Sequence, residues 1–484
     1  MSAVDTAAPA TPETRSGRSV LVTLIPLMLV LFISNLDQTI VATALPTIGR
    51  DLRSLSGTSW VATAYLLTSA ITTLIFGKLG DMHSRKKIFQ FSIAVFLIGS
   101  ALCGAAQSMT MLILFRALQG IGGGGLNSLV MAIIGDIVPA RQRSKYQASF
   151  GMVATVALIA GPLLGGLFSQ ALDWRWIFYL NLPIGVVALV AVAARLHLPK
   201  PAATAGRVDA AGALIATVFT TAVMLFTSWG GTTHPWSSPL ILGLVALSVG
   251  SLIAYLLVER RAAQPITPLH LFRSGVFNIA SVQFFVAAMV LFVAMLYIPM
   301  FMQTVQGVAP FRAGLYVIPL LIGLIIAAMT SGPAITKTGH YKIYPIVGAV
   351  LTGGAMYWLS RADQHTGSLG LLVPLFVAGA GLGFFVQVSV LAGQNAVDYK
   401  YLGVATGTLN FFKSLGGAFG AALFGSILTA ALHSGPSVHA FHLVFLLTVP
   451  FEVLALVLAL VMREKPLSEE MIEVAAGTVE APEY

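Results

Sequence analysis

The chain has 484 residues, of which 57% are hydrophobic and only 9% are charged, and its mean hydropathy is +0.88. Soluble domains average about 25% charged residues, so this composition excludes a cytosolic enzyme, a disordered protein and a nucleic-acid-binding protein. In so apolar a chain, the net charge of +9 indicates an excess of basic residues in the loops on the inner side of the membrane, where they orient the helices. The single cysteine, Cys103, excludes an internal disulfide, and no Cys/His spacing predicts a metal site.

Apolar segments long enough to cross a bilayer recur along the whole chain. A transmembrane helix needs about 20 predominantly apolar residues. The sequence predicts an all-α integral membrane protein with fourteen such helices. The predicted spans are Val20–Ala44, Trp60–Phe76, Ile88–Ala106, Met111–Ile134, Tyr146–Leu172, Ile177–Ala194, Ala210–Trp229, Pro239–Val258, Phe277–Phe301, Ala313–Ile335, Tyr344–Leu359, Leu369–Leu391, Gly403–Ala430 and Phe441–Met462.

The distribution of Lys and Arg predicts the orientation of these helices. An even number of spans places both tails on one side of the membrane. With the tails inside, the inner segments hold 20 basic residues and the outer loops hold 5. This excess predicts a protein of the plasma membrane with both termini in the cytoplasm.

Two similar loops, Gly77–Lys87 and Gly332–Lys342, divide the chain into halves offset by 255 residues. Six helices need fewer residues than that, so we expect a further helix pair between two six-helix bundles, an arrangement typical of transporters. The predicted units are an N-terminal tail (1–19), an N-terminal six-helix bundle (20–197), a linker with an inserted transmembrane hairpin (198–260), a C-terminal six-helix bundle (261–462) and an acidic cytoplasmic tail (463–484).

Asp37 and Arg116 are charged residues inside apolar spans. A charge at the bilayer centre costs about 2.5–3.5 kcal/mol on insertion scales, so each needs a partner, a wet cavity or, for the acid, a proton. Burial disfavours a charged carboxylate, so Asp37 could bind and release protons near neutral pH. Arg116 lies at a similar depth and could expel that proton or bind Gln119. The alternative for both residues is a purely structural role.

Lys413 and Glu452 lie about 10 residues into the last two spans, which run in opposite directions. Their depths therefore match. The sequence leaves two possibilities open, an ion pair between them or a second proton or cation site at Glu452.

Five motifs occur in order along the N-terminal part of the chain. They are Leu36–Pro46, Gly77–Lys87, Arg116–Gly120, Gly161–Gly166 and Trp174–Gly185. Because these motifs occur together and in this order, the chain resembles the major facilitator superfamily, specifically its fourteen-helix drug:proton antiporters. The resemblance implies that Asp37 and Arg116 take part in proton coupling.

The loop after the second span contains the elements of an inner latch. Gly77 and Asp81 lie at the helix end, and the basic residues Arg85 and Lys86 follow, with Asp136 as a candidate partner of Arg85. Such a latch would tie the halves together inside and favour the outward-facing state. Alternatively, the basic residues only set the topology.

Glycine-rich segments occur in the fourth and fifth spans. Gly122–Gly125 predicts tight helix packing. Gly161, Pro162, Gly165 and Gly166 predict a kink and a close helix approach. By resemblance, the second segment seals the cavity of exporters against proton leak.

Phe- and Met-rich surfaces can repack around varied ligands, and the ninth span has this composition. The candidate substrate-binding residues are Asp37, Gln38, Phe284, Phe285, Tyr297, Phe301, Gln387, Asn410 and Phe411.

We expect a proton-driven multidrug efflux antiporter that exports small lipophilic, cationic compounds by alternating access. No Walker motif occurs, so we expect neither ATP nor another cofactor to drive it. The expected partners are the substrate, protons and the bilayer, with the chain acting as a monomer and not as an enzyme. One alternative is a dedicated exporter of one metabolite, lipid or siderophore. Another is a membrane receptor or regulator on a transporter fold.

Overall fold

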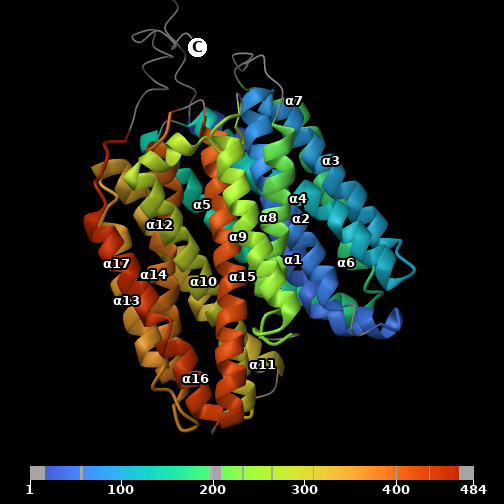
Figure 1. Cartoon of the computed structure of the whole chain (residues 1–484), viewed down its shortest axis with the longest axis vertical. Helices are drawn as coiled ribbons and strands as arrows, with labels where there is room; N and C mark the ends of the chain where they lie inside the picture. The colour runs from blue at the N-terminus through green and yellow to red at the C-terminus, as the bar shows by residue number, and fades with distance from the viewer. Residues whose placement is uncertain are drawn as a thin grey trace, which may run out of the picture.

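The computed structural model describes residues 17–54, 58–138, 140–196, 198, 209–231, 234–262, 265–308, 310–398, 401–434 and 437–467. Within these residues the chain forms α-helices, one 3-10 helix and no strand beyond an isolated bridge between Gly230 and His234. The helices run side by side in a bundle (Figure 1). The predicted all-α architecture is confirmed.

The N-terminal half is held together by close helix pairs. Its helices are α1 (Gly17–Asp51), α2 (Thr58–Met82), α3 (Arg85–Gly104), α4 (Met109–Ile137), α5 (Ala140–Ala171), α6 (Trp176–Tyr179) and α7 (Asn181–Arg195). Helix α4 packs against both α2 and α3. A Cβ atom on Gly122 would collide with the backbone of Phe96, and one on Gly124 would collide with the backbone of Ser69. The tight packing predicted for this glycine run is confirmed.

Two helices connect the halves, α8 (Ala210–Trp229) and α9 (Pro239–Glu259). Asp209 caps α8 by accepting a hydrogen bond from the Gly212 amide, and Ser238 caps α9 in the same way. Helix α8 contacts α2 on one side and α15 (Leu402–Ser434) on the other. The hairpin therefore lies against both halves (Figure 1).

The C-terminal half repeats the helical packing of the first. Its other elements are η1 (Leu269–Arg273), α10 (Gly275–Thr304), α11 (Pro310–Leu315), α12 (Ile318–Thr338), α13 (Ile343–Leu359), α14 (Ser368–Asn395), α16 (Ser437–Leu446) and α17 (Val449–Val461). The last predicted span is divided between α16 and α17. Pro450 explains why a new helix, α17, begins there, because proline lacks an amide hydrogen and fits the first turn of a helix.

Eleven helices of the described residues are long and apolar enough to cross a membrane. Three shorter apolar helices, Tyr146–Gly161, Ala211–Thr227 and Ile343–Leu359, also overlap predicted spans. Their apolar stretches have 10–17 residues, which is why they are not among the eleven. The number fourteen therefore stays a prediction.

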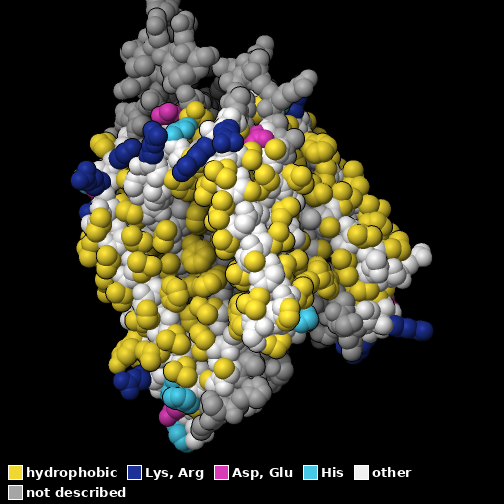
Figure 2. Space-filling view, in the orientation of Figure 1, with side chains coloured by type: hydrophobic (Ala, Val, Ile, Leu, Met, Phe, Trp, Pro, Cys, Tyr) yellow, Lys and Arg dark blue, Asp and Glu magenta, His cyan; other side chains and the backbone are white. Residues whose placement is uncertain are grey.

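The surface has the pattern of a membrane protein. Hydrophobic side chains cover the middle of the face seen in Figure 2, and Lys and Arg side chains gather at the end where α17 ends. Leu242, Val249 and Ile253 of α9 are more than half exposed in this belt. We call the end that carries Arg85–Lys87 and Arg463 the basic end.

The interior contains separate hydrophobic cores. The largest belongs to the C-terminal half and the second largest to the N-terminal half. A small cluster formed by Leu74, Ile266 and Phe411 joins α2, the segment before η1 and α15. The two largest cores therefore lie one in each half.

Candidate functional site

Asp37 is the centre of a polar network buried in the N-terminal half. Its side chain is 0% exposed. Its Oδ2 accepts from Arg116 Nη1 at 2.5 Å, and its Oδ1 accepts from Gln119 and Asn181 at 2.9 Å each. Arg and amide donors on both oxygens stabilise the charged carboxylate. The structure thus brings together the two charges that the sequence placed at equal depth.

Arg116 is held independently of Asp37. Its Nε donates to the Val61 carbonyl at 3.2 Å, and its Nη1 donates to Gln119 Oε1 at 2.8 Å. The guanidinium carbon lies 4.3 Å from the centre of the Tyr65 ring, a favourable cation–π distance. Arg116 therefore retains partners if Asp37 becomes neutral.

Asn181 and Ser100 complete the network and were missed as site residues in the sequence. Asn181 Nδ2 donates to Ser100 Oγ at 3.0 Å, and Ser100 Oγ donates to the Phe178 carbonyl at 2.9 Å. Both side chains are buried. The available signal was a polar residue inside an apolar span, because Asn181 belongs to the Trp174–Gly185 motif. Its contact with α1 depends on tertiary packing.

The latch residues tie the two halves together at the basic end. Asp81 pairs with Arg85 at 2.5 Å, and Arg85 also pairs with Asp136. Asp81 accepts from the amides of Gly403 and Val404 at 3.0 and 2.8 Å, at the first turn of α15. Helix N-termini favour a carboxylate there because their free amides carry partial positive charge.

Gly77 and Lys86 have different places in this region. A Cβ atom on Gly77 would lie 2.7 Å from the Gly403 carbonyl oxygen, so glycine allows α2 and α15 to approach. Lys86 donates to the Ala193 carbonyl at 2.7 Å, at the end of α7. This contact lies within one half, so the structure does not show Lys86 tying the halves together.

A second group of hydrogen bonds joins the two halves near the latch. Gln147 of α5 donates to Gln394 of α14 at 3.2 Å, and Gln394 donates to Thr406 of α15 at 2.9 Å. Gln394 also donates to the Met131 carbonyl of α4 at 3.3 Å. All three polar side chains are buried. Together with the latch, these bonds close the basic end.

Replacing Asp81 with asparagine is expected to loosen this closure. The substitution removes the ion pair with Arg85 and weakens the bonds to α15. A cysteine introduced at Leu74, which is buried against Phe411 of α15, in a Cys103→Ser background, should react with a maleimide about 10-fold faster, which corresponds to about 1.4 kcal/mol. Lys86→Gln is the matched control and should leave the rate unchanged. Equal rates in the Asp81 variant would contradict the latch.

The segment Gly161–Gly166 places a glycine against α1. Gly161 is buried on α5, and a Cβ atom there would collide with the side chain of Thr39. Thr39 Oγ1 bonds the Ala157 carbonyl of α5 at 3.5 Å. Gly165 is also buried. The surroundings of Pro162 and Gly166 lie outside the described part of the chain.

The candidate substrate residues on α10 are spread along most of that helix. Phe284 and Phe301 are separated by 17 positions, or about 25 Å along a helix, too far to contact one small ligand. Phe301 packs in the C-terminal core against Phe441 and Phe445. Tyr297 donates to the Ala421 carbonyl at 2.8 Å.

The remaining candidates are also scattered. Half-buried Gln38 donates to the Ser34 carbonyl at 3.3 Å, and half-buried Asn410 donates to the Thr406 carbonyl at 3.1 Å. Phe411 lies 6.2 Å from the Phe219 ring of the hairpin. Phe285 lies half-buried against Phe419, and Gln387 is buried. These candidates lie on different helices or at distant positions of one helix, so their assignment to one substrate site stays a prediction.

Glu452 and Lys413 do not pair. The Lys413 ammonium lies 5.8 Å from the centre of the Phe284 ring. Neither carboxylate oxygen of Glu452 has a hydrogen-bond partner among the described residues. Lys413 and Glu452 lie at equal depth along their helices, but equal depth does not bring two side chains together when they lie on helix faces that do not meet. Of the two possibilities that the sequence left open, the ion pair is therefore not the one found in this structure.

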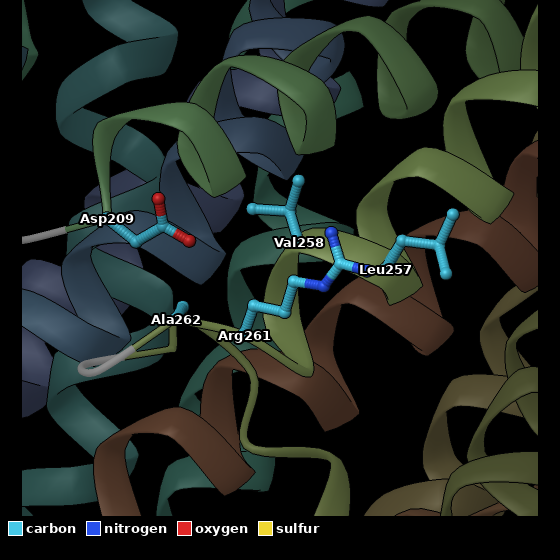
Figure 3. A pocket seen from close by; sticks show the side chains of 5 residues that line it. All are labelled: Asp209, Leu257, Val258, Arg261 and Ala262. Atoms are coloured by element: carbon cyan, nitrogen blue, oxygen red, sulfur yellow. The ribbon is translucent and has the colours of Figure 1, made fainter.

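A pocket of about 250 Å³ lies away from the Asp37 network. It is lined by Asp209 at the start of α8, and by Leu257, Val258, Arg261 and Ala262 at and after the end of α9 (Figure 3). These residues place it at the basic end of the hairpin. It offers no candidate residue of the predicted substrate site.

Comparison with known proteins decides the family. The model of the Major Facilitator Superfamily matches residues 27–421. The chain belongs to the Major Facilitator Superfamily. It is thus a multi-pass membrane transporter and not an enzyme.

The relatives of this transporter include efflux proteins. It is 36% identical to the multidrug transporter protein MdtP of Bacillus subtilis, covering 86% of this chain and 76% of that protein. It is 34% identical to multidrug resistance protein 3 of Bacillus subtilis, covering 83% and 78%.

Solved structures confirm the fold of the transporter. The proton:xylose symporter XylE has a TM-score of 0.66 with 15% identity, covering 94% of this chain and 99% of that chain. At this level of identity the likeness concerns the fold alone.

Proposed function

We propose that this transporter is a proton-coupled multidrug efflux antiporter that exports small lipophilic, cationic compounds by alternating access. The observation that carries the proposal is the buried Asp37–Arg116 pair, with a contact of 2.5 Å and side-chain exposures of 0% and 2%. The multidrug names of its relatives support the substrate class.

The network gives Asp37 two alternative states. In the first state, which this structure shows, three N–H groups donate to the two side-chain oxygens of Asp37. A proton on Asp37 removes the charge that attracts Arg116. Arg116 keeps its bonds to Val61 and Gln119 and its place over Tyr65. Proton binding therefore frees Asp37 to rearrange α1 without expelling the cation.

The ties at the basic end supply the other half of the cycle. With them in place, the transporter is closed at that end and takes up protons from the opposite side. Breaking the Asp81 and Gln394 contacts opens the basic end to substrate. Competition between substrate and proton for the N-terminal half then couples the two fluxes.

The remaining parts of the proposal concern architecture and location. We infer fourteen transmembrane helices, with α8 and α9 as the inserted pair, and both termini in the cytoplasm at the basic end. The transporter resides in the plasma membrane, acts as a monomer and needs no cofactor. The proton gradient supplies about 2.3 kcal/mol per proton for each 100 mV, enough for a substrate gradient of about 50-fold.

Reconstituted transport tests the proposal. Proteoliposomes that contain the purified transporter should accumulate ethidium when an imposed pH gradient has the correct direction, and should not do so without a gradient. Accumulation of one metabolite, lipid or siderophore with no response to dyes would identify a dedicated exporter instead. Substrate binding without gradient-coupled flux would identify a receptor.

A further inference from the structure

Glu452 is a buried acid outside the Asp37 network. It lies in the first turn of α17 and is 1% exposed. Both of its carboxylate oxygens are inaccessible to solvent and lack a hydrogen-bond partner among the described residues. No other carboxylate among these residues has both oxygens in this condition.

The helices packed against α17 bring no charge to Glu452. The most extensive contacts are with α13 and α10, and neither contains a Lys, Arg, His, Asp or Glu residue. Helix α15 also contacts α17, through the rings of Phe424 and Phe451. The titratable groups of α13 and α10 are tyrosines engaged elsewhere. Tyr297 bonds the Ala421 carbonyl, Tyr344 stacks on Phe384, and Tyr357 accepts from Arg361. Lys413 of α15 lies over Phe284.

An ionised carboxylate in such surroundings is not stable. Removing an unpaired charge from water costs far more than the net stability of a protein, so the group neutralises instead. We propose that Glu452 is a second proton-binding site, in the C-terminal half, that holds a proton in this conformation. This inference rests on the proton coupling proposed above and adds one proton to each cycle.

The packing of α17 provides a route to release. Gly353 of α13 lies opposite Glu452, and a Cβ atom there would be 3.3 Å from Glu452 Cβ. Because no side chain interlocks at this point, α17 can slide along α13 when the C-terminal half moves. A small shift then exposes the carboxyl group to water, where the proton leaves.

With both sites, the transporter exchanges two protons for each substrate molecule. This stoichiometry can be measured. With the membrane potential clamped at zero and a pH gradient of one unit, two protons balance a substrate gradient of about 100-fold and one proton balances about 10-fold. Ethidium ratios at zero net flux in proteoliposomes should fall about 10-fold in Glu452→Gln.

The matched control is Glu259→Gln. Glu259 is also buried, but its carboxylate accepts from the amides of Ile266 and Thr267. This variant should keep the wild-type ratio. An unchanged ratio in Glu452→Gln would overturn the second site while leaving proton coupling intact. Failure of the wild type to respond to pH would instead reject the proposed function.

Infrared spectroscopy tests the same site in a transporter that retains Glu452. Exposed glutamates titrate near pH 4.3, so at neutral pH only a shielded glutamate is uncharged. Isotope-labelled glutamate in the Glu259→Gln background should show the carbonyl band of a neutral acid at pH 7. Absence of that band would also overturn the proposal.

Discussion

Replacing Asp37 with asparagine is expected to abolish pH-driven efflux, with gradient-dependent ethidium transport falling at least about 100-fold. Asparagine has nearly the same shape and can still accept from Gln119 and Asn181, but it cannot carry a proton. The measurement is initial flux in proteoliposomes with and without a pH gradient.

The same substitution leaves Arg116 without a counter-charge. Removing one partner of a buried pair destabilises a protein by about 3–5 kcal/mol. The double variant Asp37→Asn with Arg116→Gln removes both charges and is expected to recover thermal stability while pH-driven efflux stays absent. This control separates the loss of the proton carrier from misfolding. Normal coupled transport by Asp37→Asn would refute the assignment.

The second large effect is expected at Arg116. Arg116→Ala should reduce coupled efflux about 100-fold or more, because the Asp37 carboxylate then keeps only the amide donors of Gln119 and Asn181. Arg116→Lys should retain part of the activity, with a loss of about 10-fold. A lysine keeps the charge but cannot bond Asp37, Gln119 and the Val61 carbonyl in one planar arrangement.

Equal activity of the alanine and lysine variants would show that the charge at this position does not matter.

The helical architecture could be predicted from the sequence for a physical reason. In hydrocarbon each backbone amide must be satisfied within its own helix, so apolar length alone predicts an element. Where local chemistry interrupts this rule, prediction was less accurate. The predicted span that contains Pro450 consists of two helices, α16 and α17.

The candidate site could be predicted from the sequence only in part. Asp37 and Arg116 stand out because charge is rare in an apolar span. Arg85 and Asp136 lie in different segments, yet the loop motif led to their pairing, which the structure shows. Asn181 and Gln394 were missed because a single amide in a long apolar segment has many possible partners.

Charge scarcity could be read from the sequence, but charge pairing could not. With 9% charged residues, the chain by itself determined a membrane-embedded helical protein and marked Asp37, Arg116, Lys413 and Glu452 as unusual. Only the tertiary structure decided that the first two form a pair and the last two do not. Depth along a helix follows from residue count, whereas contact depends on which helix faces meet, and packing of the whole bundle sets that orientation.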